Sequence, residues 1–330
     1  MRLLQIAGSF APARIGGPSV VAERVAAELA RRDHQVVVLT SGCDRTVRYN
    51  SRGLPVLAVA AADVSRVVPE VLRVLRPDVV HAHSARSIGP APLRLAQQAG
   101  CPTVVSRYGA EPPLPPELLR AAGAVVADTP DGQGARVIPI GAAAPEAGWQ
   151  RSVRTGPLRL GFMGGPAPDQ GLGQLIEALT RLRRSDYVVR VVDRASLLGL
   201  REIRERDVHV PGLVRIVPAF DPWQAGTFYG SIDALVSLPQ SPGHVNIAVR
   251  DAMAHGVWPI ATDIPANVAC IRPGVTGDLV PVGSVDALMA AIDGVLERPE
   301  GPPAGLSREL PTVADQVTAL EALYASLLAP

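Results

Sequence analysis

The sequence predicts an α/β protein of two Rossmann-like, doubly wound domains. The first observation is an alternation of buried strands and amphipathic helices that begins at residue 2 and recurs to residue 130. The second is an aperiodic segment near residues 142–157, after which the same alternation restarts. The third is length, because 330 residues are long for one core and suit two domains of about 150 residues each.

The first half predicts a parallel sheet, because its apolar runs are short, continuous and suited to burial on both faces. The runs RLLQIAG (2–8) and QVVVLTS (35–41) flank a helix over 17–33, in which apolar residues from Val20 to Leu29 share one face. Further strands are expected over 54–60, 78–84, 102–109 and 122–130, and further helices over 70–77 and 92–100.

The second half repeats the pattern and ends on an amphipathic helix. Strands are expected over 158–165, 187–194, 214–220, 234–240, 258–264 and 276–282. Helices are expected over 171–184 and 285–299, with a short one that opens near residue 244. A Pro- and Gly-rich loop over 298–310 then precedes the last helix, over 313–328.

Composition favours a globular protein of the cytoplasm. Hydrophobic residues make up 47% of the chain, and no run approaches the roughly 20 apolar residues that span a bilayer. The N-terminus predicts a first strand and not a secretory signal. The three cysteines suit reduced thiols, and no Cys, His or Asp cluster has metal-site spacing. A net charge of +1 argues against a nucleic acid partner, and all 32 basic residues are Arg.

Five segments, in order and spacing, carry a resemblance to a known family. They lie at residues 16–40, 77–84, 158–179, 233–263 and 273–292. With them the chain resembles the family 4 retaining glycosyltransferases of the GT-B fold. The resemblance implies an acceptor domain over 1–145, a linker over 146–157, a nucleotide-sugar domain over 158–311 and a helix over 312–330 that packs back onto the first domain. Substrates are then expected between the domains, beyond the carboxyl ends of the strands.

The donor loop departs from the family pattern. The family holds the donor diphosphate with an Arg and a Lys in a G-R-x-x-x-x-K-G loop, and this chain has GGPAPDQG there. Gly164 keeps the first glycine, whereas Gly165 and Gln170 replace the two cations. Gln170 still offers a hydrogen bond to the leaving diphosphate, without the charge that stabilises such a group.

The motif after the fourth strand of the second domain departs as well. The family places two glutamates there with seven residues between them, and this chain has Gly243 and Asp251. The resemblance implies that Asp251 accepts from the ribose, and a plain exposed helix residue is the alternative. Between these two positions, the resemblance implies donor binding by His244, Asn246, Ile247 and Arg250. Arg250 is also a candidate to replace one of the missing cations.

The first domain offers two candidate catalytic side chains. Tyr108 stands where the family often has a His near the donor sugar. His81 and His83 lie at a strand end, where His83 is a candidate for substrate contact and His81 is expected in the core or at an edge. With Gln170, these are the catalytic candidates: Tyr108, His83 and Gln170.

The backbone parts of the site are retained. Gly16 and Gly17, after the first strand, allow close approach of a phosphate or a sugar, and a tight turn is the alternative. The helix that opens after His244 presents free amides to an anion. By the resemblance, the segment ending at Phe220 reads the nucleotide base.

The resulting hypothesis is a glycosyltransferase that moves a sugar from a nucleotide-activated donor to a glycan, lipid or natural-product acceptor, with retention and without metal or cofactor. The competing hypothesis is a catalytically silent relative that binds a glycan or supports an active partner glycosyltransferase. Peripheral membrane contact is left open. A nucleotide-sugar epimerase of similar fold ranks third, because its acidic and His residues are not recognisable here.

Overall fold

The computed structural model describes residues 1–10, 16–84, 89–109, 114–130, 134–151, 156–165, 167–193, 210–297 and 310–329. It divides into two compact units, of which unit 1 is Met1–Gly141 with Pro311–Pro330 and unit 2 is Ala142–Leu310. The expected linker over 146–157 and the expected domain limits stay predictions. The loop expected over 298–310 lies outside the described residues except for Leu310.

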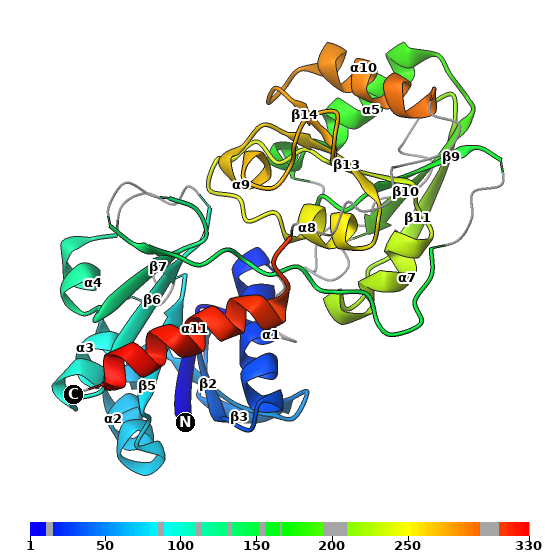
Figure 1. Cartoon of the computed structure of the whole chain (residues 1–330). Coiled ribbons are helices and arrows are strands. Elements are labelled where there is room, and N and C mark those ends of the chain that lie inside the picture. The colour runs from blue at the N-terminus through cyan, green and yellow to red at the C-terminus, as the bar shows by residue number, and fades with distance from the viewer. Residues whose placement is uncertain are drawn as a thin grey trace. The chain divides into compact units, whose positions relative to one another are not determined.

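Unit 1 contains an eight-stranded sheet in the order β3-β4-β2-β1-β5-β6-β7-β8 (Figure 1). All neighbours pair in parallel except β3, which forms an antiparallel hairpin with β4. The strands are β1 (Arg2–Ala7), β2 (Gln35–Cys43), β3 (Val47–Ser51), β4 (Leu54–Ala60), β5 (Val79–His83), β6 (Thr103–Arg107), β7 (Ala124–Ala127) and β8 (Arg136–Val137).

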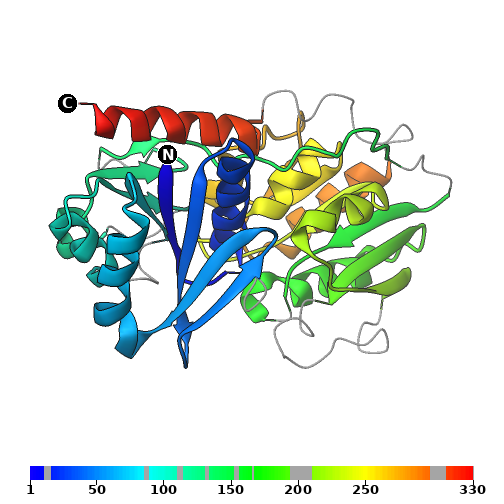
Figure 2. The ribbon, with the colours of Figure 1, turned by 90° about the horizontal axis from the view of Figure 1, so that it is seen from below.

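Helices cover both faces of the unit 1 sheet. The helices are α1 (Gly17–Arg31), α2 (Val64–Leu75), α3 (Ala91–Gln98), α4 (Pro116–Arg120) and α11 (Val313–Leu328). Side chains of α2, α3 and α4 pack in one cluster with Leu4, Ile6 and Val80. Because side chains alternate along a strand, Gln5 and His81 point to the other face, where α11 contacts His81. Both views show α11 beside α1 (Figures 1 and 2).

Unit 2 contains a six-stranded parallel sheet in the order β11-β10-β9-β12-β13-β14. Its strands are β9 (Leu158–Phe162), β10 (Tyr187–Asp193), β11 (Leu213–Pro218), β12 (Ala234–Ser237), β13 (Trp258–Thr262) and β14 (Asp278–Val280). The helices in its described residues are α5 (Leu172–Leu182), α7 (Ala225–Gly230), α8 (Ile247–Ala254), α9 (Pro265–Val268) and α10 (Val285–Leu296).

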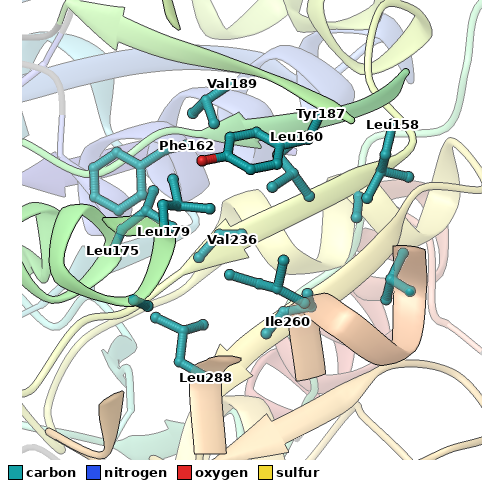
Figure 3. Packing of buried hydrophobic residues seen from close by; sticks show 14 of the residues in the cluster. Leu158, Leu160, Phe162, Leu175, Leu179, Tyr187, Val189, Val236, Ile260 and Leu288 are labelled. Atoms are coloured by element: carbon teal, nitrogen blue, oxygen red, sulfur yellow. The ribbon is translucent and has the colours of Figure 1, made fainter. Parts of the chain in front are cut away.

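The unit 2 core forms on both faces of this sheet. Figure 3 shows strand residues such as Leu160 and Ile260 packed against Leu175 of α5 and Leu288 of α10. On the other face, α7 and α8 pack with Leu235 and other residues of a second cluster. Helices on both faces of a parallel sheet explain why its strands read as continuous apolar runs. The predicted pair of doubly wound α/β units is therefore confirmed.

Helix α2 begins earlier than its pattern predicts. The expected helix over 70–77 starts directly after Pro69, and proline is a residue type that disfavours a helix interior. In the structure Pro69 lies inside a helix that begins at Val64. Val67 and Val68 are buried in the unit 1 core, and this burial offsets the lost backbone hydrogen bond.

Candidate functional site

Each sheet has one topological switch point, where the chain leaves neighbouring strands in opposite directions. In unit 2 it lies between β9 and β12, because β10 and β11 follow β9 on one side and β13 and β14 follow β12 on the other. Residues 163–171 and 238–246 leave the carboxyl ends of these two strands. Ligands of open α/β sheets bind at this position. The donor loop and the substituted motif therefore meet at the expected edge of unit 2.

The glycines of the donor loop differ in the space that is available for a Cβ atom at each position. A Cβ on Gly164 would lie 2.5 Å from Cζ of Phe162, and one on Gly171, where φ is +79°, would lie 2.4 Å from Cβ of Leu238. A Cβ on Gly165 meets only Cγ of Gln170, at 3.8 Å, among the described residues. Gly164 and Gly171 are thus required by packing, whereas position 165 has space for a side chain.

The two loops are joined at the edge by a backbone hydrogen bond. The amide of Gln240 donates to the carbonyl of Asp169 at 2.9 Å. Asn246, which precedes α8, is buried and donates through Nδ2 to Oγ of Ser237 at 2.9 Å. Its side chain therefore fixes the start of α8 against the end of β12. Gly243 and His244 are half-buried, and the amide of His244 closes a turn on the carbonyl of Ser241 at 3.0 Å.

Asp251 and Arg250 are both buried in unit 2. Oδ1 of Asp251 accepts a hydrogen bond from the amide of Ala143 at 2.9 Å, and the residue is only 3% exposed. The Arg250 charge acts on the Cys270 thiol, whose pKa is raised by burial and partly lowered by that charge. The structure thus places Asp251 on a main-chain contact that sequence reasoning missed. Its role toward ribose, and that of Arg250 toward phosphate, stay predictions.

The contact at Asp251 belongs to a segment that docks on the same side of unit 2. Nε1 of Trp149 donates to the carbonyl of Gly226 at 3.0 Å, and Nη1 of Arg151 donates to the carbonyl of Gly256 at 2.9 Å. The Trp149 ring also meets the His255 ring edge-on, with 4.8 Å between centroids. Residues 142–151, aperiodic in sequence, are thus fixed to α7 and α8 by polar and aromatic contacts.

Phe220 follows β11 at the same carboxyl edge. It is half-buried, and its ring lies 5.3 Å from that of Phe228 in α7. Ile247, the first residue of α8, is buried. Both side chains support the edge by packing, and their contact with a nucleotide stays a prediction.

The switch point of unit 1 lies between β1 and β5. Gly16 and Gly17 follow β1 at the start of α1, and His83 ends β5. A Cβ on Gly16 would meet no heavy atom within 4 Å among the described residues. Ser84, next after β5, has φ of +53°, a left-handed conformation that is uncommon for Ser. Residues 11–15 of the intervening loop lie outside the described residues.

His83 and Tyr108 contact each other inside unit 1. Nδ1 of His83 lies 2.5 Å from Oη of Tyr108, and Nε2 lies 2.6 Å from Oε1 of Gln5. Both side chains are at most 2% exposed. Burial lowers the pKa of His83 to about 3, so that its ring is neutral at physiological pH. The structure therefore brings together two of the three catalytic candidates in a buried contact.

His81 lies beside His83 with partners of its own. The two rings are stacked with 4.2 Å between centroids, because residues two apart on a strand share a face. Nδ1 of His81 lies 2.6 Å from Oη of Tyr324, and Nε2 lies 2.7 Å from Oγ of Ser106. Burial and the neighbouring His83 lower the pKa of His81 well below its usual value. The signal that could have revealed this cluster is the polar Gln5, His81 and His83 within apolar strands.

The described parts of the chain hold no group of three or more His, Cys, Asp or Glu residues arranged to bind a metal ion. They also hold no helix that is long and apolar enough to cross a membrane.

Two family models match consecutive parts of the chain. Residues 15–128 match Glycosyltransferase Family 4, and residues 157–298 match Glycosyl transferases group 1. Together these matches cover most of the chain. They include both switch-point edges, because Gly16, His83, Gln170 and Asp251 all lie within them.

A curated relative matches one part of the chain. It is the phosphatidyl-myo-inositol mannosyltransferase of Mycolicibacterium smegmatis, 29% identical over 132 residues. The match spans 39% of this chain and 33% of the relative, so it covers about a third of that protein's length.

Solved structures share the fold over nearly the whole chain. A glycosyltransferase from Rickettsia africae has a TM-score of 0.75 at 15% identity, covering 99% of this chain and 98% of its own. The apo lipopolysaccharide outer core galactosyltransferase WaaB has a TM-score of 0.69 at 14% identity, covering 99% and 100%. Anabaena HepE in complex with UDP and glucose has a TM-score of 0.68 at 14% identity, covering 99% and 97%.

Proposed function

The chain belongs to glycosyltransferase family 4, and on that premise we propose that it transfers a sugar, with retention, from a nucleotide-activated donor to an acceptor hydroxyl. The observation that carries the proposal is the meeting of two segments at the switch point of unit 2. These segments, 163–171 and 238–246, are joined by the hydrogen bond between Gln240 and Asp169. A ligand at that position meets backbone amides and the start of α8, which favour an anion without side-chain charges.

Unit 2 binds the donor and unit 1 binds the acceptor in this proposal. The likeness to HepE, solved with UDP and glucose, supports a nucleotide-linked hexose as donor. The mannosyltransferase relative acts on phosphatidyl-myo-inositol, which supports a lipid among the glycan, lipid and natural-product acceptors. Tyr108, His83 and Gln170 keep their assignment as catalytic candidates within this proposal.

The donor site works with fewer charges than the family pattern. Gly165 and Gln170 stand at the two cation positions, and Gly243 and Asp251 stand at the two glutamate positions. A lost charged hydrogen bond costs about 1.5–3 kcal/mol. The diphosphate is therefore bound more weakly than at an intact motif, and backbone amides with Gln170 supply the remaining contacts.

A thermal shift assay with UDP, GDP, ADP and dTDP tests the proposal. A nucleoside diphosphate at one hundred times its Kd stabilises the fold by about 2.7 kcal/mol, which raises Tm by several degrees. The double variant Gly165→Arg with Gln170→Lys is expected to bind the same nucleotide more tightly, most clearly at low salt. A Cβ at position 165 meets only Cγ of Gln170, at 3.8 Å, among the described residues.

A matched control separates a restored site from a general charge effect. Gly294→Arg with Gln98→Lys adds the same two charges at positions in α10 and α3. These control substitutions are expected to leave nucleotide affinity unchanged. If no nucleotide shifts Tm, before or after the restoration, unit 2 is not a nucleotide site. The catalytically silent relative that binds a glycan or supports a partner glycosyltransferase then becomes the better hypothesis.

A further inference from the structure

Two buried polar side chains at the end of β13 hold the segment that follows β12. Thr262, the last residue of β13, and Asn267 of α9 are each 0% exposed. Oγ1 of Thr262 donates a hydrogen bond to the carbonyl of Pro239 at 2.7 Å. Nδ2 of Asn267 donates to the carbonyl of Thr262, also at 2.7 Å. Because a carbonyl oxygen can only accept, the direction of both hydrogen bonds is fixed.

Pro239 lies between two residues that contact segment 163–171. Before it, Leu238 lies so close to Gly171 that a Cβ at position 171 would overlap it. After it, the amide of Gln240 donates to the carbonyl of Asp169 at 2.9 Å. Residues 238–240 are therefore held both by segment 163–171 and by β13. The hydroxyl of Thr262 thus ties the contact between the two segments to a strand that belongs to neither.

The carbonyl of Pro239 needs the partner that Thr262 supplies. Pro239 is buried, and a buried main-chain carbonyl that loses its donor must find another partner. The main chain at residue 239 then shifts, and Gln240 shifts with it because it is the next residue. A shift at Gln240 alters its hydrogen bond to Asp169, whose neighbour in the chain is Gln170, the side chain proposed for the diphosphate.

We propose that Thr262 is a positioning residue for the phosphate part of the donor site, which it shapes by holding segment 238–246 against segment 163–171. The part of this inference that concerns nucleotides rests on the proposed function, whereas the part that concerns the two segments does not. Phe220, the candidate for the base, follows β11, which is separated from β13 by β10, β9 and β12. Thr262 is therefore expected to affect the binding of the phosphates and not that of the nucleoside.

Two substitutions at Thr262 and one elsewhere isolate the effect of the hydroxyl. Thr262→Val removes the hydroxyl and keeps a branched side chain, whereas Thr262→Ser keeps the hydroxyl. Thr103→Val in unit 1 is the matched control, because Oγ1 of Thr103 also donates to a main-chain carbonyl, that of Ala121, at 2.8 Å. Thr103 is 2% exposed and begins β6, at the edge opposite to the carboxyl ends of the strands.

Hydrogen exchange at the Gln240 amide, followed by NMR, measures the contact between the segments without any ligand. Thr262→Val is expected to speed this exchange about fivefold, the factor that corresponds to one net hydrogen bond. Thr262→Ser and Thr103→Val should leave the rate near that of the wild-type protein. An unchanged rate in folded Thr262→Val would overturn the proposal, as would an equal acceleration in Thr103→Val.

Nucleotide affinity supplies a readout that a general loss of stability would not reproduce. The nucleoside diphosphate that raises Tm most among UDP, GDP, ADP and dTDP is titrated by NMR, beside its parent nucleoside. Thr262→Val is expected to weaken binding of the diphosphate about fivefold, and Thr262→Ser to restore it. The affinity for the nucleoside should be unchanged.

The outcomes of the two measurements separate this inference from the proposed function. Equal losses for the diphosphate and the nucleoside would overturn the role of Thr262 toward the phosphates. If the wild-type protein binds none of the four nucleotides while exchange at Gln240 changes as expected, the proposed function fails. The positioning of the two segments by Thr262 is then still supported.

Asn267→Leu supplies a second test if Thr262→Val is poorly folded. Oδ1 of Asn267 is buried and has no hydrogen-bond partner among the described residues, so Leu removes an unsatisfied acceptor together with the Nδ2 donor. These opposing effects on stability favour a folded variant. Exchange at Gln240 should be faster in Asn267→Leu, because the main chain at Thr262 loses the bond that fixes it. An unchanged rate there would overturn the proposed link from Thr262 to Gln240.

Discussion

Asp251 lies on a motif that we propose for nucleotide binding, and its carboxylate accepts a main-chain hydrogen bond where residues 142–151 dock. Oδ1 of Asp251 accepts a hydrogen bond from the amide of Ala143. Asp has one methylene less than the Glu of the family pattern. The Asp251 carboxylate therefore reaches less far from helix α8 than a Glu carboxylate would. This shorter reach is consistent with its contact to the amide of Ala143 within unit 2.

Substitutions at Asp251 separate these two roles. Asp251→Asn keeps an acceptor oxygen for Ala143 and is expected to leave the free energy of unfolding nearly unchanged. Asp251→Ala leaves the Ala143 amide without this partner and is expected to cost about 1–3 kcal/mol. Urea unfolding of both variants measures the difference. Equal losses in the two variants would show that the carboxylate charge, and not the acceptor, stabilises the segment.

The buried histidines of unit 1 predict a loss of stability in mild acid. The pKa of His83 is about 3 and that of His81 is also well below its unfolded value, so the unfolded state binds more protons below pH 6.5. This contribution to stability is complete above pH 6.5. It falls by about 1.4 kcal/mol per pH unit for each histidine as the pH drops toward the folded pKa.

Urea unfolding between pH 7.5 and 5.5 tests this dependence, in a range above the titration of most carboxyl groups. The variant His81→Gln with His83→Gln is the control, since neither replacement side chain titrates. The wild-type protein should lose stability across the range and the variant should lose less. Equal slopes in the two proteins would contradict the assignment to these residues.

At the scale of elements, α11 depends on close backbone approach at its start. A Cβ on Gly141 would lie 2.3 Å from the carbonyl oxygen of Thr312, the residue that caps α11. The amide of Gly141 also donates to Oε1 of Gln316 in the first turns of α11, at 3.0 Å. Farther along the same helix, Oη of Tyr324 lies 2.6 Å from Nδ1 of His81 in β5. Two segments far apart in sequence therefore approach closely at a position where a side chain on residue 141 would not fit.

Gly141→Ala is expected to destabilise unit 1 by about 1–3 kcal/mol, because backbone atoms must move to admit the methyl group. Gly294→Ala in α10 is the matched control, since its Cβ meets no heavy atom within 4 Å among the described residues. There the change should be neutral or stabilising by up to about 1 kcal/mol, as helix propensity predicts. Thermal unfolding measures both variants. A tolerated Gly141→Ala would mean that the start of α11 shifts at little cost.

At the scale of the whole molecule, unit 1 is discontinuous in sequence and unit 2 is continuous. Unit 1 needs Pro311–Pro330, whose helix buries apolar residues and Tyr324, whereas unit 2 runs from Ala142 to Leu310 without interruption. Burying one large apolar side chain contributes about 1.5–3 kcal/mol. A chain without α11 therefore loses much of what stabilises its N-terminal sheet.

The fragment 1–141 is accordingly expected to be poorly folded alone, and the fragment 142–310 to unfold cooperatively. Circular dichroism and amide hydrogen exchange compare the two. Adding a peptide of residues 311–330 should restore protection in fragment 1–141, whereas the same peptide with Tyr324→Ala should restore less. A fully protected fragment 1–141 without the peptide would show that α11 is dispensable for this unit.

Sequence alone sufficed for the family, the GT-B fold and most of the elements, whereas β3, β8, α4, α7 and α9 were not predicted. The last helix was predicted over its observed bounds, Val313–Leu328, and β4 over Leu54–Ala60. Both predictions succeed because the hydrophobic periodicity of a helix or strand depends on residues close together in the sequence. Motif order also placed Gly16 and Gln170 in loops that follow the first strand of each unit. Helix α2 was predicted over 70–77 but begins earlier, at Val64.

Only the tertiary structure decided which side-chain atoms meet. Asp251 reaches Ala143 across 108 positions of sequence, and His81 reaches Tyr324 across 243. Such contacts depend on how helices and strands pack against one another, and local sequence patterns do not predict them. A buried polar group must still find a partner when it loses water. Folding therefore determined that His83 faces Tyr108 and Gln5, a pairing that the positions of these residues in the sequence do not reveal.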